Sequence, residues 1–176
     1  MPRYNGHQNV DFQMKHTKIL GIVILLPLLL SACALFTSYD DSAPPPPVAL
    51  AVCETAKAQV GKPYRPGGTT AKGFDCSGLA FYCYGKNGIS LPRTSSDQAD
   101  AGRKVSEKNI REGDLLIFKP GFFSSHTGIY IGNGKFIHAP GRGRSVEECS
   151  LNDEHWRDML SQVRRVIPDA ADPEKK

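Results

Sequence analysis

The sequence predicts an α+β fold in which N-terminal helices pack on an antiparallel β-sheet. Apolar residues recur at helical spacing in the first half of the domain, and the period changes to strand-like alternation after residue 111. Helices gather first and strands follow, an order typical of this fold class. We expect the folded domain to cover residues 48–168 and the tail, 169–176, to be disordered.

Residues 1–32 have the pattern of an export signal. The run from Ile19 to Leu30 is apolar and follows Lys15 and Lys18. It is too short to span a bilayer and suits the apolar region of a signal peptide. The polar stretch before it suggests that translation starts at Met14.

The signal ends in Leu30-Ser31-Ala32-Cys33, which resembles a bacterial lipobox. That resemblance implies that Cys33 is lipidated and becomes the first mature residue. The alternative is cleavage by an ordinary signal peptidase, with Cys33 incidental. Residues 33–47 end in four prolines and predict an extended tether that holds the domain off a membrane surface. Ala34 after the cysteine resembles lipoproteins sent to the outer membrane.

The charge of the chain does not favour a nucleic-acid partner. The whole chain carries a formal +4, and residues 1–32 contribute +2 of it, from three basic side chains and one acidic one. No basic stripe is interleaved with aromatic residues.

The cysteines favour neither structural zinc nor complete disulfide pairing. Their spacing includes no CxxC or clustered His/Cys motif, so we expect no metal and no cofactor. A disulfide between Cys53 and Cys83 is left as an alternative, because both cysteines lie on predicted helices. The five cysteines are Cys33, Cys53, Cys76, Cys83 and Cys149.

Two longer helices and a short one are expected in the first half of the domain. The first covers 48–60 and ends at Gly61, and the second runs from Cys76 to about Asn87, with Gly88 as its stop. The short helix begins after a cap at Thr94 or Ser95 and ends at Gly102. Before it lies Arg93, which is either solvated or able to hold a substrate carboxylate.

Cys76 is the candidate nucleophile because Asp75, near an N-cap position, places it at a helix N-terminus. A free thiol with a pKa near ~8.5 is only slightly ionised at neutral pH. The helix terminus supplies roughly 0.3–1 kcal/mol toward the thiolate, whereas a histidine cation in contact supplies about 4 kcal/mol. A histidine partner must therefore provide most of the activation.

His126 and His138 lie in strand-like segments and are the candidate partners. Strands are expected at 115–118, 127–131 and 135–138, with a loop at 120–125; a further strand at 144–149, a helix at 155–160 and a closing strand at 162–167 follow.

The turn between the second and third of these strands decides whether the two histidines share a face. A two-residue turn at Asn133-Gly134 pairs Ile129 with His138 and separates the histidines. A three-residue turn at 132–134 pairs Gly128 with His138 and puts both on one face. If both histidines serve Cys76, we expect the odd-length turn or a bulge beside His126.

Six segments of the chain together form a specific set of motifs: Pro63-Tyr64-Arg65-Pro66-Gly67-Gly68, Asp75-Cys76-Ser77-Gly78, Leu91-Pro92-Arg93, Gly113-Asp114-Leu115, Ser125-His126-Thr127-Gly128-Ile129-Tyr130-Ile131-Gly132 and Ile137-His138-Ala139. On these segments the chain, from about Val60 to Val166, resembles the NlpC-type cell-wall cysteine peptidases, and among them the murein endopeptidase lipoproteins of Gram-negative bacteria.

The resemblance implies a papain-like cysteine peptidase fold in which Cys76 is the nucleophile, His126 the general base and acid, and His138 the orienting residue. On composition alone Tyr64 reads as a core residue. The resemblance places it in the active site, as support for the oxyanion. It also implies that Asp75 and Ser77 line the substrate groove; for Arg93, contact with a substrate carboxylate is a hypothesis.

The implied function is hydrolysis of peptide bonds in peptidoglycan, at the D-alanyl–diaminopimelyl cross-link. The alternatives are the γ-D-glutamyl–diaminopimelyl bond and a non-catalytic peptidoglycan-binding lipoprotein. Acyl transfer on lipids is disfavoured, because no second apolar anchor follows the domain. We expect an outer-membrane lipoprotein, monomeric and facing the periplasm, with stem peptides as substrate and a regulatory periplasmic protease or adaptor as a candidate partner.

Overall fold

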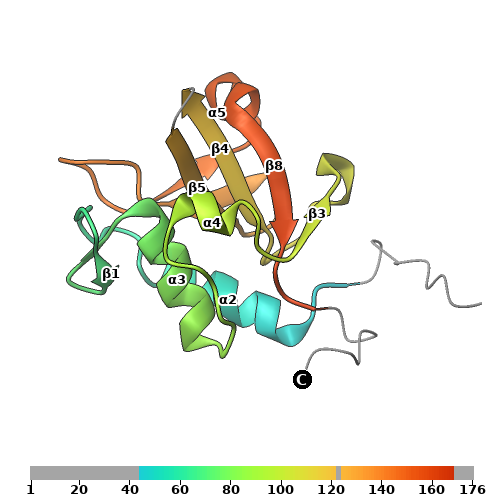
Figure 1. The fold of residues 1–176 in the computed structure, drawn as a ribbon, viewed down its shortest axis with the longest axis horizontal. Coiled ribbons are helices and arrows are strands. Elements are labelled where there is room, and N and C mark those ends of the chain that lie inside the picture. The colour runs from blue at the N-terminus through green and yellow to red at the C-terminus, as the bar shows by residue number, and fades with distance from the viewer. Residues whose placement is uncertain (1–43, 122–123, 169–176) are drawn as a thin grey trace, which may run out of the picture. The chain divides into compact units, whose positions relative to one another are not determined.

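The computed structural model describes residues 44–121 and 124–168, which form helices packed on an antiparallel sheet (Figure 1). The predicted α+β class is therefore confirmed. The signal, Cys33, most of the tether and the tail from 169 lie outside the described residues. In chain order the elements are α2 (Pro47–Lys57), β1 (Thr69–Thr70), β2 (Gly73–Phe74), α3 (Cys76–Lys86), α4 (Ser95–Gln98), β3 (Arg103–Val105), η2 (Glu107–Asn109), β4 (Leu115–Gly121), β5 (Ser124–Tyr130), β6 (Lys135–His138), β7 (Glu147–Ser150), α5 (Glu154–Met159) and β8 (Leu160–Arg165).

Six strands form the main sheet, in the order β3-β8-β4-β5-β6-β7. Every neighbouring pair in it is antiparallel. The pairing of β4 with β5 is regular from Leu115–Ile129 to Phe118–His126 and then shifts register. β1 and β2 form a separate two-stranded ribbon just before α3.

The two faces of the sheet bury different clusters, because alternate side chains of a strand point to opposite sides. Leu115 and Ile117 of β4 pack with α2 and α3 in the larger core. Leu116 and Phe118 belong to a second cluster, which includes Trp156 of α5. The helices that carry Cys76 and Trp156 thus contact the sheet from opposite faces.

The helix α3 begins and ends where the sequence predicts. Asp75 is its N-cap and accepts a hydrogen bond from the Gly78 backbone N–H, while Gly88 adopts a φ of 77° just beyond its end. The helix α2 ends at Lys57, earlier than predicted, because the following residues form tighter turns that lead to Gly61.

The turn between β5 and β6 has three residues, the odd length that we expected if both histidines act together. Gly128 pairs with His138, and Ile131 and Lys135 close the loop through a backbone hydrogen bond of 2.9 Å. The turn residues, Gly132, Asn133 and Gly134, all have positive φ. His126 and His138 are therefore diagonal neighbours on one face of the sheet.

Other predicted boundaries were wrong by a few residues. The region expected to be a loop, 120–125, is partly strand, since β4 continues to Gly121 and β5 begins at Ser124. The helix expected to reach Gly102 ends at Gln98, with Thr94 as its cap. The short elements β1, β2, β3 and η2 were not predicted, because segments of two or three residues carry no period.

A buried ion pair joins the end of the sheet to the start of β4. The Arg165 Nε and Asp114 Oδ1 atoms lie 2.8 Å apart, and both side chains are almost inaccessible to solvent. The same carboxylate accepts the backbone N–H of Arg111. Burial of this kind requires complete pairing, since an isolated charge would be costly.

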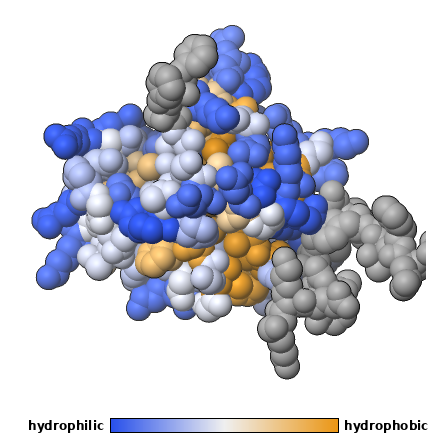
Figure 2. Space-filling model, viewed as in Figure 1, coloured by the Kyte–Doolittle hydropathy of each residue, from blue (hydrophilic) through white to orange (hydrophobic). Residues whose placement is uncertain are grey.

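Cys53 and Cys83 are both buried and free, so the structure shows no bridge between them. Among the described residues, no helix is both long and apolar enough to cross a membrane. Figure 2 shows hydrophobic side chains reaching the surface near α2 and α3, which carry the exposed residues Leu50 and Phe81.

Candidate active site

Cys76 is the first residue of α3 and is held there by a tight contact between the helix and the preceding loop. A Cβ atom at Gly78 would lie 2.0 Å from the Gly68 carbonyl oxygen. The Asp75 backbone N–H donates to that same oxygen. Glycine at position 78 is therefore what allows the loop to close against the start of the helix.

Opposing effects act on the Cys76 thiol. Burial raises its pKa, while backbone N–H groups of Thr127 and Ser77 lower it; the net shift is upward. The Thr127 contact places the Cys76 sulfur against β5. Thr127 directly follows His126 in the sequence. Because an N-terminal N–H of a helix has no intrahelical partner, the Cys76 backbone can also donate to an external oxygen.

His126 and His138 are in direct contact. The His126 Nε2 and His138 Nδ1 atoms lie 2.7 Å apart, with the ring planes nearly perpendicular. Gly128 lies opposite His138, and a Cβ there would lie 2.8 Å from Phe136. Burial lowers the pKa of His126 to about 4 and that of His138 to about 3, so both rings are neutral at pH 7.

The outer nitrogen of His138 determines how protons are arranged along this pair. His138 Nε2 lies 3.3 Å from Glu147 Oε1 and 3.5 Å from Cys149 Sγ. A carboxylate only accepts, so we assign the His138 proton to Nε2. Nδ1 of His138 then accepts from His126 Nε2–H, which leaves the His126 Nδ1 lone pair as the base for a thiol proton.

Tyr64 lies at the edge of the larger core, and its role as support for the oxyanion stays a prediction. The residue packs against the larger core cluster and bridges to Phe74. Burial raises its pKa, and electrostatic interaction with Cys76 and Asp75 raises the pKa further. Tyr64 therefore interacts electrostatically with the candidate nucleophile.

Arg93 pairs with a carboxylate of the protein itself, which sequence reasoning missed. It donates from Nη2 to Asp75 Oδ2 at 2.6 Å and from Nη1 to Asp75 Oδ1 at 3.0 Å, and also reaches Ser77 Oγ at 2.9 Å. Burial alone would raise the pKa of Asp75, but these bonds and the backbone N–H of Gly78 hold it below its usual value. Arg93 therefore stiffens the turn that presents Cys76. Contact of Asp75, Ser77 and Arg93 with substrate stays a prediction.

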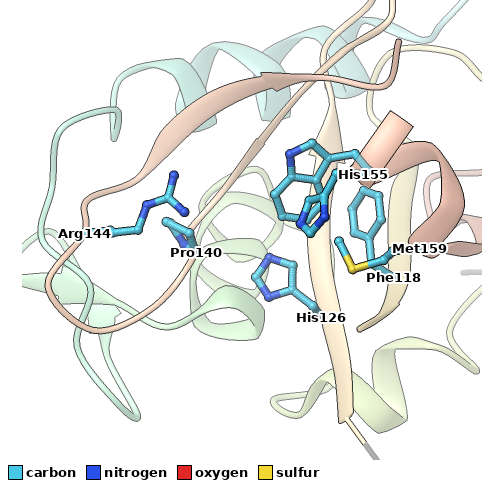
Figure 3. A pocket seen from close by; sticks show the side chains of 7 residues that line it. Phe118, His126, Pro140, Arg144, His155 and Met159 are labelled. Atoms are coloured by element: carbon cyan, nitrogen blue, oxygen red, sulfur yellow. The ribbon is translucent and has the colours of Figure 1, made fainter. Parts of the chain in front are cut away.

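A pocket of about 310 Å³ opens beside His126 on the α5 side of the sheet. Figure 3 shows His126 and Phe118 near His155 and Met159, with Arg144 and Pro140 across the opening. Trp156 completes the lining. No motif pointed to this pocket, because its walls come from four separate segments.

The arrangement suits nucleophilic catalysis by a thiol. A cysteine at a helix N-terminus, a neutral imidazole on the strand that contacts this cysteine and a second group that orients the imidazole are the components of a cysteine–histidine centre. The structure brings the segments of Cys76, His126, His138 and Tyr64 together. Cys33 lies outside the described residues.

Comparison with known proteins gives consistent matches. The sequence model of the NlpC/P60 family matches residues 61–165. Murein DD-endopeptidase MepS/Murein LD-carboxypeptidase of Escherichia coli K12 is 41% identical over 105 residues, covering 59% of this chain and 55% of that protein. Gamma-D-glutamyl-L-lysine dipeptidyl-peptidase of Bacillus subtilis is 38% identical over 119 residues, covering 66% and 40%.

Solved structures agree with the sequence matches. An NlpC/P60 family protein from Bacillus cereus superposes with a TM-score of 0.66 at 37% identity, covering 73% of this chain and 43% of that one. The chain spans only about half the length of the first curated relatives it matches. The family match covers more than half of the chain and includes Cys76, His126 and His138. The chain therefore belongs to the NlpC/P60 family.

Proposed function

We propose that the protein is a murein endopeptidase, a cysteine peptidase that hydrolyses peptide bonds in peptidoglycan. The observation that carries the proposal is the 2.7 Å contact between His126 Nε2 and His138 Nδ1, which leaves His126 Nδ1 as a base on β5, the strand whose Thr127 backbone contacts Cys76. Similarity to peptidases named for murein and for γ-glutamyl peptides supports the substrate class.

In the first half-reaction the Cys76 sulfur attacks the scissile carbonyl carbon while His126 Nδ1 takes the thiol proton. Negative charge on the carbonyl oxygen is stabilised by the Cys76 backbone N–H and by Tyr64. His126 then gives its proton to the leaving amine, and the C–N bond breaks to leave a thioester. Water attacks this thioester with His126 as base, which releases the acid and restores the thiol.

Burial shapes how the thiol is activated. Because it raises the pKa of Cys76 and lowers that of His126, the resting pair is thiol and neutral imidazole. From the sequence we expected a histidine cation to activate the thiol. The pKa shifts instead favour a neutral imidazole in the resting enzyme. Proton transfer accompanies attack, an effect that typically contributes about 10²–10⁴-fold to the rate.

The bond we propose is the D-alanyl–diaminopimelyl cross-link, on the similarity to MepS. The γ-D-glutamyl–diaminopimelyl bond is the second candidate, and the Bacillus relative favours it. Incubation of purified sacculi with the full chain separates the two by the masses of the released muropeptides. Loss of cross-linked dimers supports the first; shortened stem peptides support the second.

The same experiment tests catalysis against simple wall binding. The Cys76→Ala protein serves as the matched control, because it keeps the groove and lacks the sulfur. Release by the intact protein only supports the enzyme. If both proteins sediment with sacculi and neither releases fragments, the chain is a binding protein.

We also propose that Cys33 is lipidated and anchors the protein in the outer membrane, with the domain in the periplasm. The support is the lipobox-like Leu30-Ser31-Ala32-Cys33 after an apolar run. Cells fed an alkyne-labelled palmitate should label the wild-type protein in the outer-membrane fraction and leave Cys33→Ser unlabelled. Label on both proteins would contradict the assignment.

A further inference from the structure

Three potential metal ligands meet behind the histidine pair, although no spacing in the sequence indicated them. His138 pairs directly with Glu147 across β6 and β7. Cys149 follows Glu147 by two residues, so its side chain lies on the same face of the sheet. The His138, Glu147 and Cys149 ligand atoms all lie within 4.8 Å of one another.

The separations of these atoms match the edges of a zinc coordination tetrahedron. His138 Nε2 lies 3.3 Å from Glu147 Oε1 and 3.5 Å from Cys149 Sγ, and the last two atoms are 3.8 Å apart. Tetrahedral Zn²⁺, with bonds of about 2.0–2.1 Å to N and O and about 2.3 Å to S, has edges of about 3.3 Å between N and O and about 3.5 Å to sulfur. Shifts of a few tenths of an ångström would suffice.

We propose that His138, Glu147 and Cys149 bind a thiophilic divalent cation of the zinc class and that its binding switches off the Cys76 centre. Three protein ligands leave the fourth position to water. Binding replaces the thiol proton of Cys149 by the metal and releases that proton to solvent. The inhibitory half of the proposal rests on the proposed peptidase function; the binding half does not.

The surroundings of the cluster suit reversible binding of a metal ion. The Trp156 side chain donates a hydrogen bond to the Cys149 sulfur and so helps to fix its position. Arg144 donates to Glu147 Oε1 and opposes a cation, but its side chain is 59% exposed and can turn into solvent. His138 is fully buried, whereas Glu147 and Cys149 are partly accessible, so an ion enters from the β7 side.

Coupling to catalysis follows from the shared ring of His138. A metal on Nε2 takes the lone pair there, so the neutral ring carries its proton on Nδ1. That proton then points at His126 Nε2, which must accept, and the His126 proton moves to Nδ1. His126 Nδ1 is then a donor and cannot take the proton of Cys76. A wrong tautomer of this kind costs about 10⁴-fold in a serine-protease triad.

Cobalt(II) is the probe for binding, because thiolate ligation gives a charge-transfer absorption that needs no catalytic activity. The full chain is titrated with CoCl₂ under reducing conditions, in parallel with Cys149→Ser and Cys76→Ala. Cys76→Ala is the matched control, since Cys76 is the other partly exposed cysteine among the described residues. We expect the absorption in wild type and Cys76→Ala and its loss in Cys149→Ser. Retention in Cys149→Ser and loss in Cys76→Ala would overturn the site.

Inhibition is measured as the ratio of sacculus digestion with and without ZnCl₂ for each active protein, so that any change in basal rate cancels. We expect at least a tenfold loss in wild type, reversed by EDTA, and at least a tenfold higher zinc requirement in Cys149→Ser and Glu147→Gln. Equal zinc sensitivity in all three proteins would refute the regulatory claim. Cobalt bound at Cys149 without any digestion by metal-free protein would reject the peptidase and keep the metal site.

Discussion

His126 Nε2 and His138 Nδ1 lie 2.7 Å apart, and the three-residue turn at 132–134 is what makes this contact available. One residue fewer in the turn would place His138 opposite Ile129 and direct the two rings to opposite faces of the sheet. The length of the turn thus makes Gly128 pair with His138, and this pairing brings the two histidine side chains to the same face of the sheet.

Replacing His138 tests that geometry. His138→Ala removes the acceptor for His126 Nε2–H, and we expect kcat to fall by about 10²–10⁴-fold. His138→Asn keeps an oxygen acceptor and should retain clearly more activity. The measurement is muropeptide release by each folded variant. Equal losses in both variants would show that the acceptor is not what matters.

Two glycines of α3 allow a matched test of the packing around Cys76, because a Cβ would clash at one of them and not at the other. In Gly78→Ala the new Cβ would meet the Gly68 carbonyl oxygen, whereas in Gly85→Ala it would meet nothing within 4 Å. We expect Gly78→Ala to lose about 2 kcal/mol or more of unfolding free energy, together with activity. Gly85→Ala should gain about 0.5–1 kcal/mol. Urea unfolding checks both values, and a stable, active Gly78→Ala would contradict the close approach.

The pairing of Arg93 with Asp75 predicts a pH-dependent loss of stability. The folded pKa of Asp75 lies below its ordinary value of 3.8, so this carboxylate stabilises the fold above that pH, and the contribution disappears as pH falls through the lower folded value. Arg93→Gln should lose about 1–2 kcal/mol near neutral pH, a modest figure because the arginine is partly exposed.

The deficit of Arg93→Gln relative to wild type should shrink as the pH falls below about 4 and vanish below the lower folded pKa of Asp75 in wild type, where this carboxyl is protonated in both proteins. Urea unfolding at a series of pH values measures it. The Asp75→Asn variant is the control, since adding Arg93→Gln to it should cost little more. A deficit that stays constant with pH would show that Arg93 acts through packing alone.

Breaking the buried pair should unfold the domain more readily than any surface change. In Arg165→Met, Asp114 becomes an uncompensated buried charge, and we expect a loss of about 3–5 kcal/mol. The double variant Arg165→Met/Asp114→Leu should recover a large part of this loss. Thermal unfolding of the three proteins decides the matter, and a double variant as unstable as the single one would refute the charge argument.

Features set by a few adjacent residues could be predicted from the sequence. The start of α3 follows from Asp75 and its end from Gly88, because a cap and a glycine stop act within one helical turn. The alternatives for the β5–β6 turn could also be stated in advance. Choosing between them required the assumption that both histidines act together, since glycine and asparagine fit both turns.

Features made by distant segments could not be predicted. Arg93 meets Asp75 only because the chain after α3 returns past the helix start. Cys149 reaches His138 through the register of β6 and β7, which a search for ligand spacing does not detect. The pocket beside His126 likewise depends on where α5 packs.

The most direct test of the account is to titrate the full chain with a thiol-alkylating reagent and compare two quantities in the same samples. One is the fraction of each cysteine modified, from peptide mass spectrometry; the other is the remaining rate of peptidoglycan digestion. We predict that activity falls in proportion to modification of Cys76 and that excess muropeptide substrate slows both. Digestion that persists when Cys76 is fully modified would contradict its role as the nucleophile.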